Sequence, residues 1–265
     1  MTHRLIARVV LIAVVLLLVA GPAVAQAPSE AELKQANNPL ASFNAFNVQN
    51  YYMPDLSGLP DDTANTTWLR GVFPLGRWLL RASLPLNNFP VGGGQNQSGL
   101  GDLNAFAAYL LSKESSPRTY GVGPLLAAPT ATDDALGSGK WQLGAAAVYF
   151  DMSSSQVQWG GLVTWQTSVA GDSDREDTNV LVVQPFGIFQ IGKGTYLRSA
   201  PIWVFDLENS TYNVPIGFGI GKVLATPRIV YNIFLEPQFT ALNKGAGQAQ
   251  FQVFAGINLQ FKKKG

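Results

Sequence analysis

The sequence predicts an all-β chain, specifically a transmembrane antiparallel up-and-down β-barrel of about 12 strands after a cleaved N-terminal signal peptide. From about residue 43 onward, apolar and polar residues alternate with a period of two, which is typical of β-strands. The alternating segments are long, and the connections between them are long and short in turn. Only 13% of the residues are charged, compared with about 25% in an average soluble domain.

The predicted signal peptide covers the first 25 residues. Arg4 and Arg8 precede an apolar run from Val9 to Ala20, and Ala23-Val24-Ala25 provides an A-x-A cleavage site. The apolar run is shorter than the roughly 20 residues that a membrane-spanning helix needs, so an uncleaved anchor is the weaker alternative. The predicted division is a signal peptide (1–25), a periplasmic N-terminal segment (26–42) and an outer-membrane barrel (43–265). The sequence leaves open whether 26–42 plugs the barrel or hangs in the periplasm.

Twelve strands are predicted after this segment. The last one shows the pattern most clearly, because Phe251, Val253 and Ile257 alternate with polar residues such as Gln252 and Asn258. Segments of this length exceed the usual five or six residues of globular strands and suit tilted membrane-crossing strands, which need about 9–11. The predicted strands are 43–53, 65–73, 76–87, 100–112, 118–128, 140–151, 157–169, 179–191, 195–207, 212–223, 228–240 and 249–261.

Long and short connections follow one another along the chain. Long polar loops at one rim, tight turns at the other and both termini on the periplasmic side are typical of outer-membrane barrels, and they imply an even strand number. A secreted β-sandwich or soluble barrel would explain the alternation, but not an outward face rich in Phe, Trp, Val and Leu. The predicted long loops are Pro54–Ala64, Asn88–Gly99, Pro129–Gly139, Ala170–Thr178 and Ala241–Gln248, and only the ninth connection, Glu208–Thr211, is shorter than this order predicts.

Two further patterns indicate the outer membrane of a Gram-negative cell. Trp and Tyr residues such as Trp78, Tyr109 and Trp141 lie near strand ends, where an aromatic belt meets the lipid–water boundary. The ending Gly256-x-x-Leu259-x-Phe261 resembles the C-terminal signal of outer-membrane barrels, although Lys262-Lys-Lys-Gly265 follows it. We therefore expect outer-membrane lipid and the barrel-assembly machinery as partners.

Several sequence motifs extend this interpretation to a family. They are Asn38-Pro39, Gly121-Val-Gly-Pro124, the loop from Pro129 to Trp141, Ser168-Val-Ala-Gly-Asp172, Gln184-Pro-Phe186 and Val214 to Lys222. On these motifs the chain resembles, over about residues 38 to 261, the family named for the "MetA-pathway of phenol degradation", whose members are often labelled neuromedin U or transporter. This resemblance implies an outer-membrane barrel that passes small, often hydrophobic or aromatic, molecules, and it implies no catalytic residue.

The residue inventory disfavours enzymatic and nucleic-acid functions. There is no Cys, and the only histidine, His3, lies in the predicted signal peptide. Zinc sites of Cys and His, His-ligated haem and nucleophile–histidine catalysis are therefore excluded for the exported chain, which leaves a carboxylate-based hydrolase as the enzymatic alternative. The 18 basic residues nearly cancel the 17 acidic ones, so no basic face for nucleic acid is expected. We expect no enzyme, no cofactor and no metal.

Charged residues within the predicted strands are the candidate transport residues. Each falls on the face opposite an apolar row, and a charge that faces lipid at mid-depth costs about 2–4 kcal/mol for Arg or Lys. We therefore expect all of them to point into the lumen, where they either line a path or pair with one another. They are Arg70, Arg77, Arg81, Asp102, Arg198, Asp206 and Glu236.

The loop Pro129–Gly139 is the candidate outer motif, with Asp133, Asp134 and the following Lys140. It is interpreted as an inward-folded constriction or a divalent-cation contact, or as a loop held by Asx-turns and glycines, which we favour. Together these features predict a channel for passive or facilitated passage of small molecules. The alternative is a structural or adhesive barrel whose outer loops bind a partner.

Overall fold

The computed structural model describes residues 28–40, 43–113 and 116–262. The predicted signal peptide (1–25) lies outside the described residues. The helices and strands of the described residues are α2 (Glu30–Ala36), β1 (Asn44–Leu56), β2 (Ala64–Leu75), β3 (Trp78–Gly92), β4 (Gln95–Leu100), β5 (Leu103–Leu110), β6 (Arg118–Ala128), the 3-10 turn η1 (Asp134–Leu136), β7 (Lys140–Asp151), β8 (Val157–Gly171), β9 (Asn179–Gly192), β10 (Thr195–Ser199), β11 (Trp203–Asp206), β12 (Thr211–Gly217), β13 (Gly219–Ala225), β14 (Ile229–Lys244) and β15 (Ala249–Phe261).

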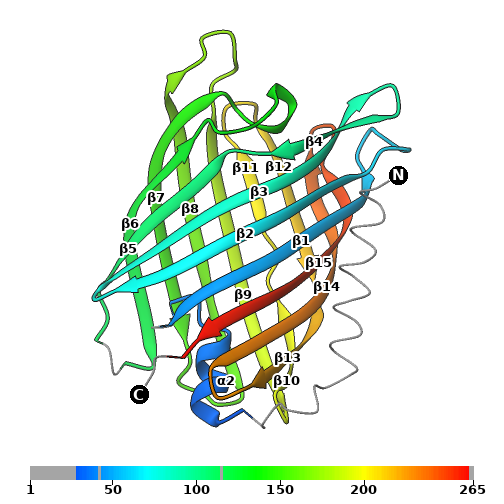
Figure 1. The fold of residues 1–265 in the computed structure, drawn as a ribbon. Coiled ribbons are helices and arrows are strands. Elements are labelled where there is room, and N and C mark those ends of the chain that lie inside the picture. Colours follow the sequence, from blue (N-terminus) through cyan, green and yellow to red (C-terminus); the bar gives the residue numbers. More distant parts are fainter. Residues whose placement is uncertain (1–27, 41–42, 114–115, 263–265) are drawn as a thin grey trace.

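The strands form one closed antiparallel barrel (Figure 1). Sequential neighbours pair all the way round, and β15 pairs with β1 as well as with β14, which removes both free edges. Three barrel-crossing strands are interrupted, and each is divided into two consecutive segments: β4 and β5, β10 and β11, and β12 and β13. The fifteen segments therefore make twelve barrel-crossing strands. The predicted fold class and strand number are confirmed.

Strand β7 illustrates how the sequence alternation becomes an inside and an outside. Trp141 and Leu143 are exposed on the outer face, whereas Gln142 and Phe150 are buried on the inner face. Strand β8 behaves in the same way, with Trp159 exposed at 53%. Because an apolar outer face is stable only against lipid, the barrel has the surface of a membrane protein.

The connections confirm long loops at one rim and tight turns at the other, with one exception. The predicted loop Asn88–Gly99 is wrong, because β3 and β4 continue through it as a hairpin. Its tip at Gly93 and Gly94 has positive φ, which glycine adopts without steric cost. Side chains also support the hairpin, since Asn88 donates to Ser98 Oγ at 2.6 Å.

The N-terminal segment packs into the barrel at the rim with the tight turns, where β15 also ends (Figure 1). Helix α2 begins at a capping box, in which Ser29 and Glu32 each accept from the other's backbone N–H. No helix in the described residues is long and apolar enough to cross a membrane.

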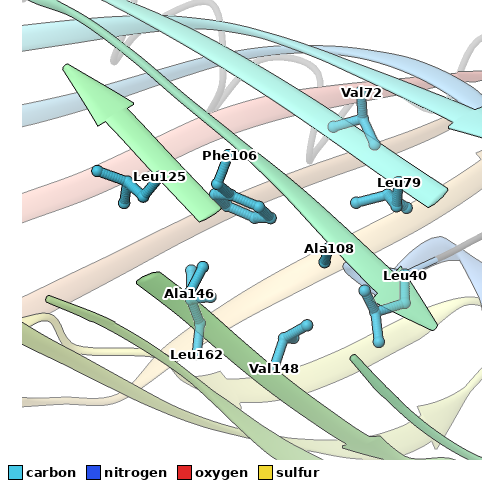
Figure 2. Close-up of a cluster of buried hydrophobic side chains, with 9 residues drawn as sticks. All are labelled: Leu40, Val72, Leu79, Phe106, Ala108, Leu125, Ala146, Val148 and Leu162. Carbon is cyan, nitrogen blue, oxygen red and sulfur yellow. The ribbon is translucent and has the colours of Figure 1, made fainter. Parts of the chain in front are cut away.

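Apolar side chains fill the barrel near this rim. Leu40, which follows α2, lies among inward-facing residues of six strands, including Leu79, Phe106 and Val148 (Figure 2). A second cluster joins Ala36 to Phe150 and its neighbours. The lumen is therefore packed near the rim with the tight turns and open from the middle of the barrel to the rim with the long loops.

Candidate functional site in the barrel lumen

The described residues line two cavities in the lumen. The larger, of about 840 Å³, is lined at one end by residues of the long-loop rim, such as Leu59 and Leu136. The smaller, of about 150 Å³, borders the N-terminal segment at Asn37 and Pro39. Pockets of several hundred Å³ suit small-molecule ligands, so the larger cavity is the candidate functional site.

Arg70 and Arg81 line both cavities. They occupy inward-facing positions of β2 and β3. The register pairs Arg70 with Ser83, so Arg81 is the diagonal neighbour of Arg70, and such neighbours lie about 7–8 Å apart. Each guanidinium lies over an aromatic ring: Arg70 is 4.8 Å from the centroid of Trp68, and Arg81 is 4.5 Å from that of Phe106. These contacts are cation–π interactions. Both residues point inward, as predicted.

Neither of these arginines has an acidic partner among the described residues. Arg70 donates a hydrogen bond to Gln49 Oε1, but its Nε lacks a partner. The Nε of Arg81 also lacks one. The wall between the two cavities therefore presents two positive charges without counter-charges.

Arg198 and Glu236 form the opposite arrangement, a buried ion pair. Arg198 Nε lies 2.8 Å from Glu236 Oε2, with side-chain exposures of 11% and 0%. The other carboxylate oxygen of Glu236 accepts from the Ala200 N–H and from Gln238 Nε2, both at 2.8 Å. The Arg198 guanidinium also lies 3.6 Å from the centroid of Phe234. Both carboxylate oxygens of Glu236 thus accept hydrogen bonds within the wall, as a buried carboxylate requires.

Asp102 points inward as predicted, but it binds a loop. Its carboxylate accepts from the N–H groups of Ala131 and Ser138 at 3.1 and 2.7 Å, and from Ser138 Oγ at 2.8 Å. The Asp102 side chain also leaves no room at Gly137, where an added Cβ would lie 2.6 Å from its oxygen. Asp102 therefore holds the Pro129–Gly139 loop against the top of the cavity.

Two predicted lumen residues lie at the rims instead. Arg77 is exposed in the β2–β3 turn, where it donates to the Leu110 carbonyl and stacks on Tyr109 at 5.0 Å. Asp206 ends β11 and accepts from the N–H groups of Glu208 and Asn209, each at 3.0 Å. Arg77 lies in a turn, where alternation fixes no side, whereas Asp206 is paired on the inward-facing parity of β11 and reaches the rim because the strand ends there.

The outer loop motif is held by an Asx-turn and by an ion pair. Asp133 Oδ1 accepts from the Ala135 N–H at 3.0 Å. Asp134 pairs with Arg175 at 3.6 Å, and Arg175 also donates to the Gly137 carbonyl. The loop folds inward far enough for Leu136 to be buried in the cavity wall.

Lys140, the last residue of this motif, cross-links a second loop. Its Nζ lies 3.1 Å from Asp177 Oδ1. Hydrogen bonds from Lys140 and Ser168 hold the pKa of Asp177 below its ordinary value. No group of three or more potential metal ligands occurs in the parts of the chain that the structure describes.

The sequence did not reveal how the N-terminal segment contacts the lumen. Asn232 Nδ2 donates to the Ala36 carbonyl at 2.9 Å and to Asn37 Oδ1 at 2.8 Å, and Gln260 donates to the Gln35 carbonyl. Strand alternation predicts that Asn232 and Gln260 face the lumen, but it does not predict that they contact α2. This segment covers the end of the smaller cavity that lies toward the rim with the tight turns.

An ion pair between Glu32 and Lys262 ties the helix to the end of β15. Although partial burial raises the pKa of Glu32, hydrogen bonds from Lys262 and Ser29 outweigh it and leave the pKa below its ordinary value. The pair therefore favours the docked helix while Glu32 is ionised.

Comparisons with known structures support the barrel architecture. An outer membrane channel from Pseudomonas putida F1 aligns with a TM-score of 0.59 and 17% identity over 84% of this chain and 97% of that one. The NanC porin aligns with a TM-score of 0.54 and 13% identity over 82% and 100%. At these identities, the likeness shows the shared fold. No family model and no curated protein matches the sequence.

Proposed function

We propose that this protein is an outer-membrane channel for passive or facilitated passage of small molecules. The observation that carries the proposal is a cavity of about 840 Å³ inside a closed barrel whose outer face is apolar. Selectivity comes from the lumen side chains, chiefly Arg70 and Arg81, and from the inward-folded outer loop. The likeness to solved outer membrane channels supports this function.

The remaining expectations belong to the same proposal. Residues 1–25 act as a cleaved signal peptide, β15 engages the barrel-assembly machinery, and the tight turns and α2 face the periplasm. The chain is a member of the phenol-degradation MetA-pathway family and not an enzyme. In this orientation, the N-terminal segment narrows the periplasmic end of the path.

Planar lipid-bilayer recording and solute flux in liposomes test the channel. We expect single-channel conductance from the full barrel and an increased conductance when Asn232→Ala loosens the docked helix. Asn213→Ala is the matched control, because Asn213 faces the lumen but bonds to the Ala249 carbonyl, far from α2. Absence of both conductance and solute flux would refute the channel.

A second candidate is a structural or adhesive barrel, and it is favoured by the cross-linked outer loops. Arg175 and Lys140 join the loops at 129–139 and 172–178 through ion pairs with Asp134 and Asp177. Deleting residues 130–138 separates the two functions. Altered flux supports transport, whereas lost binding of whole cells to a surface with unchanged flux supports adhesion.

A further inference from the structure

Four polar groups without partners gather on the inner face of β1, β2 and β3. Tyr51 Oη, Arg70 Nε, Arg81 Nε and Ser83 Oγ form no hydrogen bond within the described residues. All four side chains line the larger cavity. Buried polar groups are nearly always satisfied in folded proteins, so this part of the wall is suited to a polar or charged ligand.

The strand register brings these groups onto one patch. Arg70 lies directly opposite Ser83, and Arg81 is the diagonal neighbour of Arg70. Trp68 lies under the Arg70 guanidinium and is in turn the diagonal neighbour of Tyr51. The patch therefore runs without a break from Arg81 to Tyr51.

The charge of the patch selects an anion. Asp102 is the one carboxylate among the residues that line the larger cavity, and its oxygens are occupied by the outer loop. The nearby Glu236 is neutralised by Arg198. Two adjacent guanidiniums without counter-charges are stabilised by an opposite charge, and their planar donor sets match the two oxygens of a carboxylate.

The surroundings of the patch select an apolar body. Trp68, Phe89 and Ile202 line the larger cavity and are only partly buried. Leu162 and Val182 line the same cavity. An anion as small and hydrated as chloride or phosphate would leave these apolar surfaces uncovered.

We propose that the lumen binds small organic anions in which a carboxylate is attached to an apolar, ring-sized body. Arg70 and Arg81 hold the carboxylate through their terminal guanidinium nitrogens, and Trp68 contacts the body. This proposal rests on the proposed passage of small molecules and names the class of solute.

Calorimetric titration of the folded barrel in detergent tests the site. We expect sodium benzoate to bind at least tenfold more tightly than benzamide, which has the same body without the charge, and more tightly than phosphate. Arg70→Gln and Arg81→Gln should each weaken benzoate binding at least tenfold. The matched control is Arg77→Gln, which removes a rim arginine outside the cavity and should leave the affinity unchanged.

Two further measurements keep the outcomes distinct. Heat-modifiable gel migration reports folding of each variant. Arg81→Lys retains the charge but not the planar donor set, so it should weaken benzoate binding less than Arg81→Gln does. Equal binding of benzoate and benzamide, or benzoate affinity unchanged by both Gln variants, would overturn the anion site. Benzoate binding as tight as that of phosphate or weaker would overturn the apolar-body assignment.

Bilayer recording separates this site from the channel itself. If benzoate binds through the arginines but the barrel passes no current or solute, the site stands and the channel is refuted. If the barrel conducts but binds benzoate without dependence on Arg70 and Arg81, the channel stands and the site is refuted.

Discussion

Two arginine sites face the same lumen and differ in their partners. Arg198 is paired with the fully buried Glu236, which also accepts from the Ala200 N–H. Arg70 and Arg81 have aromatic rings beneath them and no carboxylate beside them. In the first arrangement the two charges neutralise each other without a ligand, so the pair is a structural part of the barrel wall. The second is complete only when an anion is present, and this difference separates a structural site from a binding site.

The largest expected effect comes from breaking the paired site. Glu236→Gln leaves Arg198 as a buried charge without a counter-charge, so we expect a loss of about 3 kcal/mol in the free energy of unfolding. Arg81→Gln should cost less than about 1 kcal/mol, because it removes a charge that already lacks an acidic partner. Urea unfolding of the barrel in lipid vesicles measures both, with the exposed Glu208→Gln as control. Equal losses from the Glu236 and Arg81 variants would remove the distinction between the two sites.

The next effect comes from giving the open site a partner. Gln49 accepts a hydrogen bond from Arg70, so Gln49→Glu places a carboxylate beside the arginine with almost no change in shape. We expect benzoate affinity to fall about tenfold, which corresponds to about 1.4 kcal/mol. Gln166→Glu is the control, because Gln166 faces the cavity but bonds to Asn104 and Gln142. A similar fall in both variants would indicate a general charge effect on the lumen.

The barrel was predictable from the sequence because strand alternation is local. Residues such as Trp141 and Gln142 differ in polarity, and that difference alone sorts them to lipid and lumen. Arg70, Arg81, Arg198 and Glu236 were placed inside by the same rule. Their partners were not predictable, since Arg198 and Glu236 lie 38 residues apart and meet only because β13 pairs with both of their strands.

Residues at the rims and in the N-terminal segment escaped prediction for a different reason. Arg77 and Asp206 border turns, where hydrogen bonds to local backbone groups decide the side-chain direction. The docking of α2 depends on Asn232 and Gln260, which both donate to backbone carbonyls, and a backbone carbonyl carries no sequence signal. Alternation thus predicts the wall but not what fills it.

A smaller effect, on conductance, should come from loosening α2, the helix at the end of the smaller cavity. Asn232→Ala removes two hydrogen bonds to the helix end, which weakens docking by about 1–2 kcal/mol. We expect higher single-channel conductance, with benzoate binding retained because Arg70 and Arg81 are untouched. Bilayer recording and calorimetry of the same preparation measure the two quantities. Loss of benzoate binding with unchanged conductance would assign the helix to the binding site.

The smallest effect concerns pH and the same helix. The pKa of Glu32 is held below its ordinary value of about 4.5 by Lys262 and Ser29, so its contribution to docking is complete above that value and is lost as the pH falls through the lowered pKa. Because this pair is partly exposed, the contribution is a few tenths of a kcal/mol. Conductance should therefore rise slightly between pH 6 and pH 3, and Glu32→Gln should remove that rise, whereas Glu30→Gln should keep it. A rise that persists in the Glu32 variant would place the pH-sensitive contact elsewhere in the lumen.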